Sequence, residues 1–178
     1  MTTANGDNAV HAGPSSWVLD PSATTATFSH KTFWGLATVR GTFREVAGSG
    51  AILADGTGRG RLEIAAASLD TKNRQRDNHL RSADFFNAAE HPQIIIDIAS
   101  AILRDPDSVH VTGTLTAAGT TRPLNVAARL SEATGQAVTL TAEADIDRAD
   151  FGMTWNRGGM LKAPAHVTVV ARFVPAAS

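Results

Sequence analysis

The stretch that decides the fold is VHVTGTLT, residues 109–116, in which apolar and polar side chains alternate one by one. In an extended chain, Val109, Val111 and Leu115 share one face, whereas His110 and three threonines share the other. Strict alternation is typical of a β-strand with one buried face and one solvated face. The segment therefore predicts a strand of an antiparallel sheet rather than of a parallel one.

The same alternation recurs along most of the chain. It is found at residues 62–66, 94–98, 123–130, 138–147 and 167–173. Turn-forming residues separate these runs, for example Asp55-Gly56 and Pro106-Asp107. About eight strand candidates joined by short turns favour a β-sandwich or a closed barrel.

Composition narrows the class of protein. The chain has 178 residues, 43% of them hydrophobic and 19% charged, which is ordinary for one soluble domain. The formal net charge is −1 and no long basic run is present, so the sequence lacks the surplus of positive charge that is typical of nucleic-acid-binding proteins. The absence of cysteine excludes disulfides and thiolate metal ligands. Six histidines without ligand-like spacing predict no metal site.

The N-terminal segment differs in character from the rest. Residues 1–16 are small, polar and without pattern, and they predict a mobile tail before a domain that spans residues 17–178. No signal-peptide pattern and no long apolar run is present, so we expect no stable membrane insertion. If Met1 is the native start, a cytoplasmic location follows. If a signal peptide was removed ahead of this sequence, a periplasmic or secreted location is expected instead.

The segment RQRDNHLRSADFF, residues 74–86, does not alternate. It predicts a short helical crossover around residues 72–89, with Asp70 or Thr71 as a suitable N-cap. The His91-Pro92 pair then returns the chain to an extended strand.

The inward faces of the strands carry many small residues. They are Ala66, Gly113, Ala128, Ala142, Ala144 and Ala171. The interior of an eight-stranded barrel is either just filled by side chains or holds one small ligand. Small inward residues predict unfilled volume, but alanine is also abundant on the outward faces, so both interpretations stay open.

Several segments, taken in order, resemble one known family. They are WVLDP at 17–21, VRGTF at 39–43, SLDT at 68–71, RDNHLRSADFF at 76–86, HP at 91–92, VTGTLT at 111–116 and DRADFG at 147–152. Together they resemble the YceI-like, or polyisoprenoid-binding, family from Trp17 to about Val174. Ala23 and Thr24 stand where this family usually has a His-Ser pair, and His30 lies near the place of another family histidine.

The resemblance implies an eight-stranded, antiparallel, lipocalin-like β-barrel with the helical crossover beside it. It also implies binding of a long-chain amphipathic lipid inside the barrel, for sequestration or transport. The lipid is expected to be a polyisoprenoid of the quinone type, or a fatty acid or amide. No catalytic activity and no cofactor other than the lipid is implied. Family members are often dimers, so a homodimer is expected as well.

Two sets of residues are the candidate ligand contacts. The apolar pocket is predicted to contain Phe28, Trp34, Phe43, Leu80, Phe85, Phe86, Phe151, Met153 and Trp155. The polar mouth is predicted to contain Arg76, Asp77, His79 and Arg81. For this second set a structural role is the favoured alternative, with an i,i+4 pair of Asp77 and Arg81 on the crossover helix.

Two other functions remain in competition with lipid binding. In the first, the protein is an enzyme that acts on a lipid, with His79 and Asp77 as its acid–base groups. In the second, it is a structural or stress-related barrel that holds no ligand. We expect a binding protein rather than an enzyme, because no nucleophile accompanies His79 and Asp77 in the sequence.

Overall fold

A closed ring of antiparallel strands forms the body of the molecule in the computed structural model, which describes residues 15–161 and 164–177. The strands are β1 (Ser15–Leu19), β2 (Thr25–Thr32), β3 (Ala37–Phe43), β4 (Val46–Ile52), β5 (Gly58–Ala65), β6 (Leu69–Asp70), β7 (Gln93–Asp105), β8 (Ser108–Ala117), β9 (Thr120–Ala133), β10 (Val138–Ile146) and β11 (Ala165–Pro175). The helices are α1 (Arg74–Arg81) and the short 3-10 turns η1 (Phe33–Gly35), η2 (Ala66–Ser68), η3 (Arg148–Phe151) and η4 (Arg157–Gly159).

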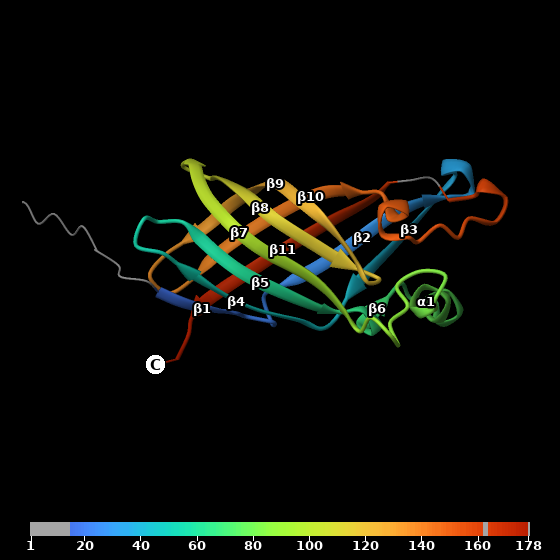
Figure 1. The fold of residues 1–178 in the computed structure, drawn as a ribbon, viewed down its shortest axis with the longest axis horizontal. Coiled ribbons are helices and arrows are strands. Elements are labelled where there is room, and N and C mark those ends of the chain that lie inside the picture. The colour runs from blue at the N-terminus through green and yellow to red at the C-terminus, as the bar shows by residue number, and fades with distance from the viewer. Residues whose placement is uncertain (1–14, 162–163, 178) are drawn as a thin grey trace, which may run out of the picture.

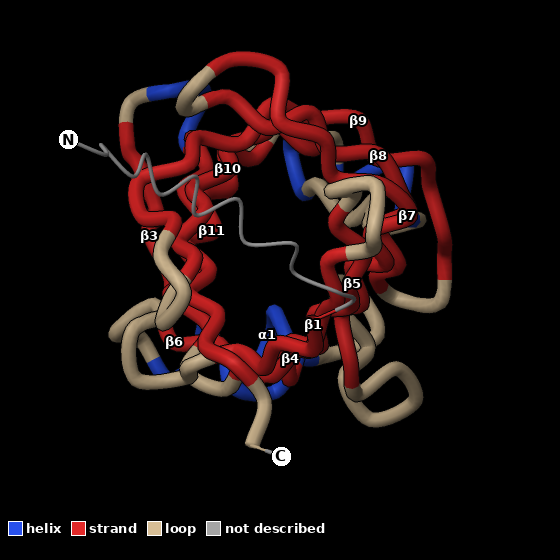
Figure 2. The backbone as a smooth tube through the Cα atoms, turned by 90° about the vertical axis from the view of Figure 1, so that its left-hand side faces the viewer, coloured by secondary structure: helices blue, strands red, loops and turns tan. Residues whose placement is uncertain are grey.

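Eight strands close the ring in the order β1-β4-β5-β7-β8-β9-β10-β11, and β11 returns to β1 through pairs such as Val18 with Val174. The end-on view in Figure 2 shows the strands arranged around a common axis. The predicted eight-stranded antiparallel barrel is confirmed. Closure removes both sheet edges, which would otherwise expose unpaired backbone groups.

The remaining strands prolong one end of the wall. β2 pairs with β11 beyond β1, β3 pairs with β2, and β6 pairs with β3. Helix α1 lies at the same end as β3 and β6, as Figure 1 shows. We call this the α1 end of the barrel. It holds most of the irregular structure and, as shown below, most of the buried charge.

The alternating sequence pattern produces the core. In β8, Val109 and Val111 are buried, and in β5, Leu62 and Ile64 are buried. The largest buried cluster lies toward the α1 end and includes Leu69, which is 1% exposed. A smaller cluster is built around Val109, Val111 and Ala128.

The crossover has the predicted position but a different cap. Asn73, rather than Asp70 or Thr71, caps α1, because its side chain accepts a hydrogen bond of 3.0 Å from the backbone N–H of Arg76. Asp70 and Thr71 are engaged elsewhere, as described below. Strand β1 begins at Ser15, inside the predicted tail of residues 1–16, and residues 1–14 of that tail lie outside the described residues. Among the residues that the structure describes, no helix has the length and apolar character needed to span a membrane.

Candidate ligand-binding site

The barrel encloses an apolar cavity of about 220 Å³. Several phenylalanines and Met153 line it, together with aliphatic residues from β5 and β7 to β11. Among the described residues, three polar ones contribute to the lining: Thr27, Glu143 and Arg148. The cavity therefore favours an apolar ligand group over a polar one.

Small side chains create this space. Ala128, Ala142, Ala144 and Ala171 all line the cavity, so the inward alanines leave volume unfilled. The cavity is smaller than the roughly 300–1,000 Å³ of a typical ligand pocket. A narrow chain fits such a space better than a bulky ring system does.

Five of the nine predicted pocket residues line the cavity. They are Phe28, Phe43, Phe86, Phe151 and Met153. Three of the rings come together, since the centroid of Phe43 lies 5.5 Å from that of Phe28 and 5.7 Å from that of Phe86.

The other four do not line it. Leu80, Phe85 and Trp155 belong to the packing between α1 and the loop after η3, where the His79 ring lies 5.1 Å from Phe85 and 4.6 Å from Trp155. Trp34 is 61% exposed. Strand β2 ends at Thr32, and the positive φ of Trp34 (54°) places it in the turn between β2 and β3, so the strand alternation does not reach it.

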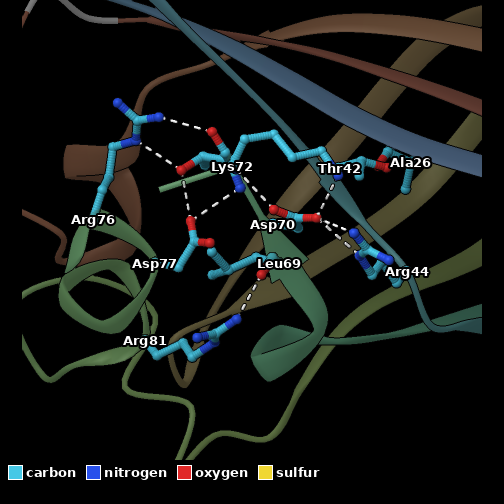
Figure 3. A network of polar contacts seen from close by, with 10 residues as sticks. Ala26, Thr42, Arg44, Leu69, Asp70, Lys72, Arg76, Asp77 and Arg81 are labelled. Atoms are coloured by element: carbon cyan, nitrogen blue, oxygen red, sulfur yellow. Dashed lines mark hydrogen bonds and ion pairs between the residues drawn. The ribbon is translucent and has the colours of Figure 1, made fainter. Parts of the chain in front are cut away.

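The predicted polar mouth is a structural brace between α1 and β6. Asp77 is 6% exposed, and its carboxylate accepts hydrogen bonds from the backbone N–H (3.0 Å) and the hydroxyl (2.6 Å) of Thr71. Arg76 donates to the hydroxyl of Thr71 at 2.7 Å and to its carbonyl at 2.8 Å. Figure 3 shows Arg76 and Asp77 turned toward the segment that carries Leu69, Asp70 and Lys72.

Arg81 completes this brace. Its guanidinium donates to the carbonyls of Ala67 (2.8 Å) and Leu69 (2.6 Å). The predicted pair of Asp77 with Arg81 is therefore wrong, because each side chain binds the preceding strand region instead. His79 contacts Asp84, with 2.8 Å between Nε2 and the carboxylate.

A surface cluster lies beside the brace. Arg44 and Lys72 both bind the carboxylate of Asp70, and their hydrogen bonds, that of Arg44 most strongly, hold the pKa of Asp70 well below its ordinary range. A shallow hollow next to this cluster, lined partly by Arg40, Lys72 and His166, opens widely to solvent. Within residues 15–161 and 164–177, no three His, Asp or Glu side chains are placed to hold a metal ion.

Two half-buried polar side chains, Arg148 and His30, were not among the predicted contacts. Arg148 lines the cavity, and its Nη1 donates to the carbonyls of Met153 and, at 2.8 Å, Trp155. Among the described residues, Arg148 Nε and His30 Nε2 are buried without a hydrogen-bond partner. We call Arg148 and His30 the lumen pair.

The electrostatics of the lumen pair follow from burial. Desolvation lowers the pKa of Arg148, and desolvation followed by the positive charge of Arg148 lowers the pKa of His30. The lumen pair thus combines a cation with an imidazole that favours its neutral form. Alternation could have revealed both residues, because Arg148 continues the inward phase of Ala144 and Ile146, and His30 continues that of Phe28.

Comparison with known proteins agrees with this architecture. Protein YceI of Escherichia coli O157:H7 is 34% identical over 102 residues, which cover 54% of this chain and 53% of that protein. Protein YceI of Salmonella arizonae is 33% identical over a stretch of the same length. The chain thus matches about half the length of these curated relatives.

Solved structures share the fold. BcnA of Burkholderia cenocepacia has a TM-score of 0.78 at 16% identity, covering 86% of this chain and 98% of BcnA. A polyisoprenoid binding domain from Saccharophagus degradans, implicated in plant cell wall breakdown, has a TM-score of 0.73 at 15% identity, covering 90% of this chain and 98% of that domain. The family model of the YceI-like domain matches residues 17–174 of this chain. The chain therefore belongs to the YceI-like domain family.

Proposed function

We propose that the protein binds one long-chain amphipathic lipid, with the apolar tail inside the barrel, and that it sequesters or carries this lipid without converting it. The single observation that carries the proposal is the almost wholly apolar cavity within the closed ring of strands. The polyisoprenoid binding domain from Saccharophagus degradans, which shares the fold, adds support for a ligand of this class.

Burial of the tail supplies the driving force. Each methylene group removed from water contributes about 0.8 kcal/mol, before the costs of ordering the chain are subtracted. Contacts between aliphatic side chains and a tail distinguish poorly between a polyisoprenoid and a fatty chain. Specificity must come from the length of the cavity and from polar groups at its end. Since the cavity measures about 220 Å³, we expect lining side chains to change rotamer when a long tail enters.

The lipid itself is the first test. Native mass spectrometry of the purified protein, beside mass spectrometry of an organic extract of the same sample, should show one co-purified lipid per chain. Preparations that are free of lipid, and that also fail to bind isoprenoid quinones, fatty acids and fatty amides, would contradict the proposal.

A pair of variants locates the binding site. Ala142→Phe places a large side chain in the lining and should weaken binding of a long-chain probe at least tenfold. Ala127→Phe is the matched control, because Ala127 is exposed on the outer face of the neighbouring strand β9. It should leave binding unchanged. Equal affinities for both variants would place the ligand outside the barrel.

Non-enzymatic binding is a separate part of the proposal. Asp77 and His79 turn to different partners, Thr71 and Asp84, which supports a structural role for both. A lipid recovered from the protein chemically unchanged after long incubation is the expected result, and His79→Ala should not alter it. Turnover that this variant abolishes without unfolding the protein would favour the enzymatic alternative. The homodimer and the cytoplasmic location stay predictions.

A further inference from the structure

The lumen pair identifies the chemistry of the ligand's head group. Arg148 begins η3, directly after Asp147 at the end of β10, and it is one of the few polar side chains in the cavity lining. Its guanidinium is fixed by the carbonyls of Met153 and Trp155, so it is held in place before any ligand arrives. Its Nε is buried and has no partner among the described residues.

The charge of Arg148 has no ion-pair partner among the described residues, in contrast to that of Arg172, which is also half-buried. Arg172 contacts two carboxylates, those of Asp20 (3.1 Å) and Glu132 (3.2 Å). In contrast, no carboxylate within residues 15–161 and 164–177 lies within ion-pair distance of Arg148. The neighbouring Asp147 accepts a hydrogen bond of 2.9 Å from the backbone N–H of Ala149 instead.

Asp147 attracts Arg148 electrostatically but forms no ion pair with it. A half-buried cation without an ion-pair partner is unfavourable in an apolar cavity, and an anionic ligand would reduce that cost. Desolvation and, after it, the positive charge of Arg148 lower the pKa of His30, but His30 is not one of the residues that line the cavity. Arg148 is therefore the residue of the lumen pair that a ligand can meet.

We propose that the head group is an anion, a carboxylate or a phosphate ester, which lies against the guanidinium of Arg148 while the tail fills the cavity. This inference rests on the proposed function and names the class of lipid within it. It predicts that a quinone, an alcohol or an amide with the same tail binds more weakly, because each leaves the Arg148 cation without a counter-ion.

Four ligands with one tail test this directly: hexadecanoic acid, hexadecyl phosphate, hexadecanamide and hexadecan-1-ol. Each is titrated below its critical micelle concentration at pH 7.5, with dissociation constants from competition against a fluorescent fatty probe. The wild-type protein should bind at least one of the two anions ten times or more tighter than either neutral ligand. The better of the two anions distinguishes a free acid from a phosphate ester.

Variants show which residue carries the preference. Arg148→Met should bring the anions and the neutral ligands to within about threefold of one another, and Arg148→Lys should keep part of the preference. Arg122→Met is the matched control, because Arg122 is exposed and donates to the carbonyl of Asp150 just beside η3. It removes the same charge outside the cavity and should keep the full preference. If Arg148→Met does not fold, Arg148→Gln provides the second readout. It removes the charge but keeps a hydrogen-bond donor for the carbonyls of Met153 and Trp155, and it should also lose the preference.

The outcomes separate the two proposals. If all four ligands bind the wild-type protein equally, the anionic head group is wrong and lipid binding stands. If none of them binds and isoprenoid quinones do not bind either, the proposed function fails. If Arg148→Met weakens all four ligands equally, Arg148 is a structural residue and the inference is overturned. If Arg122→Met removes the preference as fully as Arg148→Met does, the preference does not come from the cavity and the inference is also overturned.

Discussion

Two groups of ionisable side chains lie at the α1 end of the barrel, and they differ in whether their polar atoms have hydrogen-bond partners. In the brace, which consists of Arg76, Asp77 and Arg81, each side chain is hydrogen-bonded to the β6 region. In the lumen pair, Arg148 and His30 each bury a nitrogen without a partner among the described residues. The comparison teaches that a dense run of charge in a sequence does not by itself mark a binding site.

The physical reason lies in the cost of burying polar groups. A buried group with all its hydrogen bonds made has little capacity left for a ligand, and breaking its network is costly. A buried group with an unused hydrogen bond gains free energy when a ligand supplies the partner. The brace should therefore govern stability, whereas the lumen pair should govern binding.

Asp77→Ala should have the largest effect on stability. It removes the acceptor for both hydrogen bonds from Thr71 and should lower the free energy of unfolding by about 3 kcal/mol, as measured by urea denaturation. Asp77→Asn keeps one acceptor oxygen and should cost less. A loss below about 1 kcal/mol for Asp77→Ala would mean that the brace does not stabilise the fold.

Arg81→Met should have the next largest effect. It removes two hydrogen bonds to backbone carbonyls and should lower the free energy of unfolding by about 1–2 kcal/mol. Arg74→Met, at an exposed position on the same helix, should change it by less than about 0.5 kcal/mol. Binding of hexadecanoic acid by the folded protein should be the same in both variants. A selective loss of binding in Arg81→Met would assign the brace to the ligand after all.

Arg148→Met should change stability far less than Asp77→Ala. Loss of the hydrogen bonds to Met153 and Trp155 destabilises the fold, but removal of a cation from the cavity stabilises it. The two effects partly offset each other. We therefore expect a free energy of unfolding within about 1 kcal/mol of the wild-type value when no lipid is bound. Thermal unfolding of delipidated samples measures this. A loss as large as that of Asp77→Ala would remove the distinction between the two groups.

The pH dependence of stability sharpens the comparison further. The pKa of His30 is lowered in the folded state, so the unfolded chain binds more protons near and below the ordinary histidine value of 6.5. The contribution of His30 is fully present above pH 6.5 and is lost as the pH falls toward the lowered pKa. His30→Gln should flatten this part of the curve in urea titrations without lipid. An unchanged slope would show that His30 is not desolvated in solution.

Much of the fold can be predicted from the sequence, because strand alternation records which face is buried. The helical crossover could be predicted as well, since residues 74–86 break the alternation. Its polar contacts could not. Asp77 and Arg81 have i,i+4 spacing, but their partners, Thr71 and the carbonyl of Leu69, depend on how β6 packs against the helix.

The candidate site was only partly predictable for a similar reason. Phe28 and Phe43 follow the inward phase of their strands, whereas Trp34 falls in a turn that ends the alternation. Arg148 follows the inward phase of β10 into η3, but a charged residue in that register does not suggest burial. That it lacks an acidic partner among the described residues emerges only from the three-dimensional arrangement.

The most direct test of the contrast between brace and lumen pair is the crystal structure of the protein with hexadecanoic acid bound. The account predicts the tail inside the ring of strands and a carboxylate oxygen within hydrogen-bonding distance of the Arg148 guanidinium. A carboxylate bound at Arg76 or Arg81, or a tail lying outside the barrel, would contradict it.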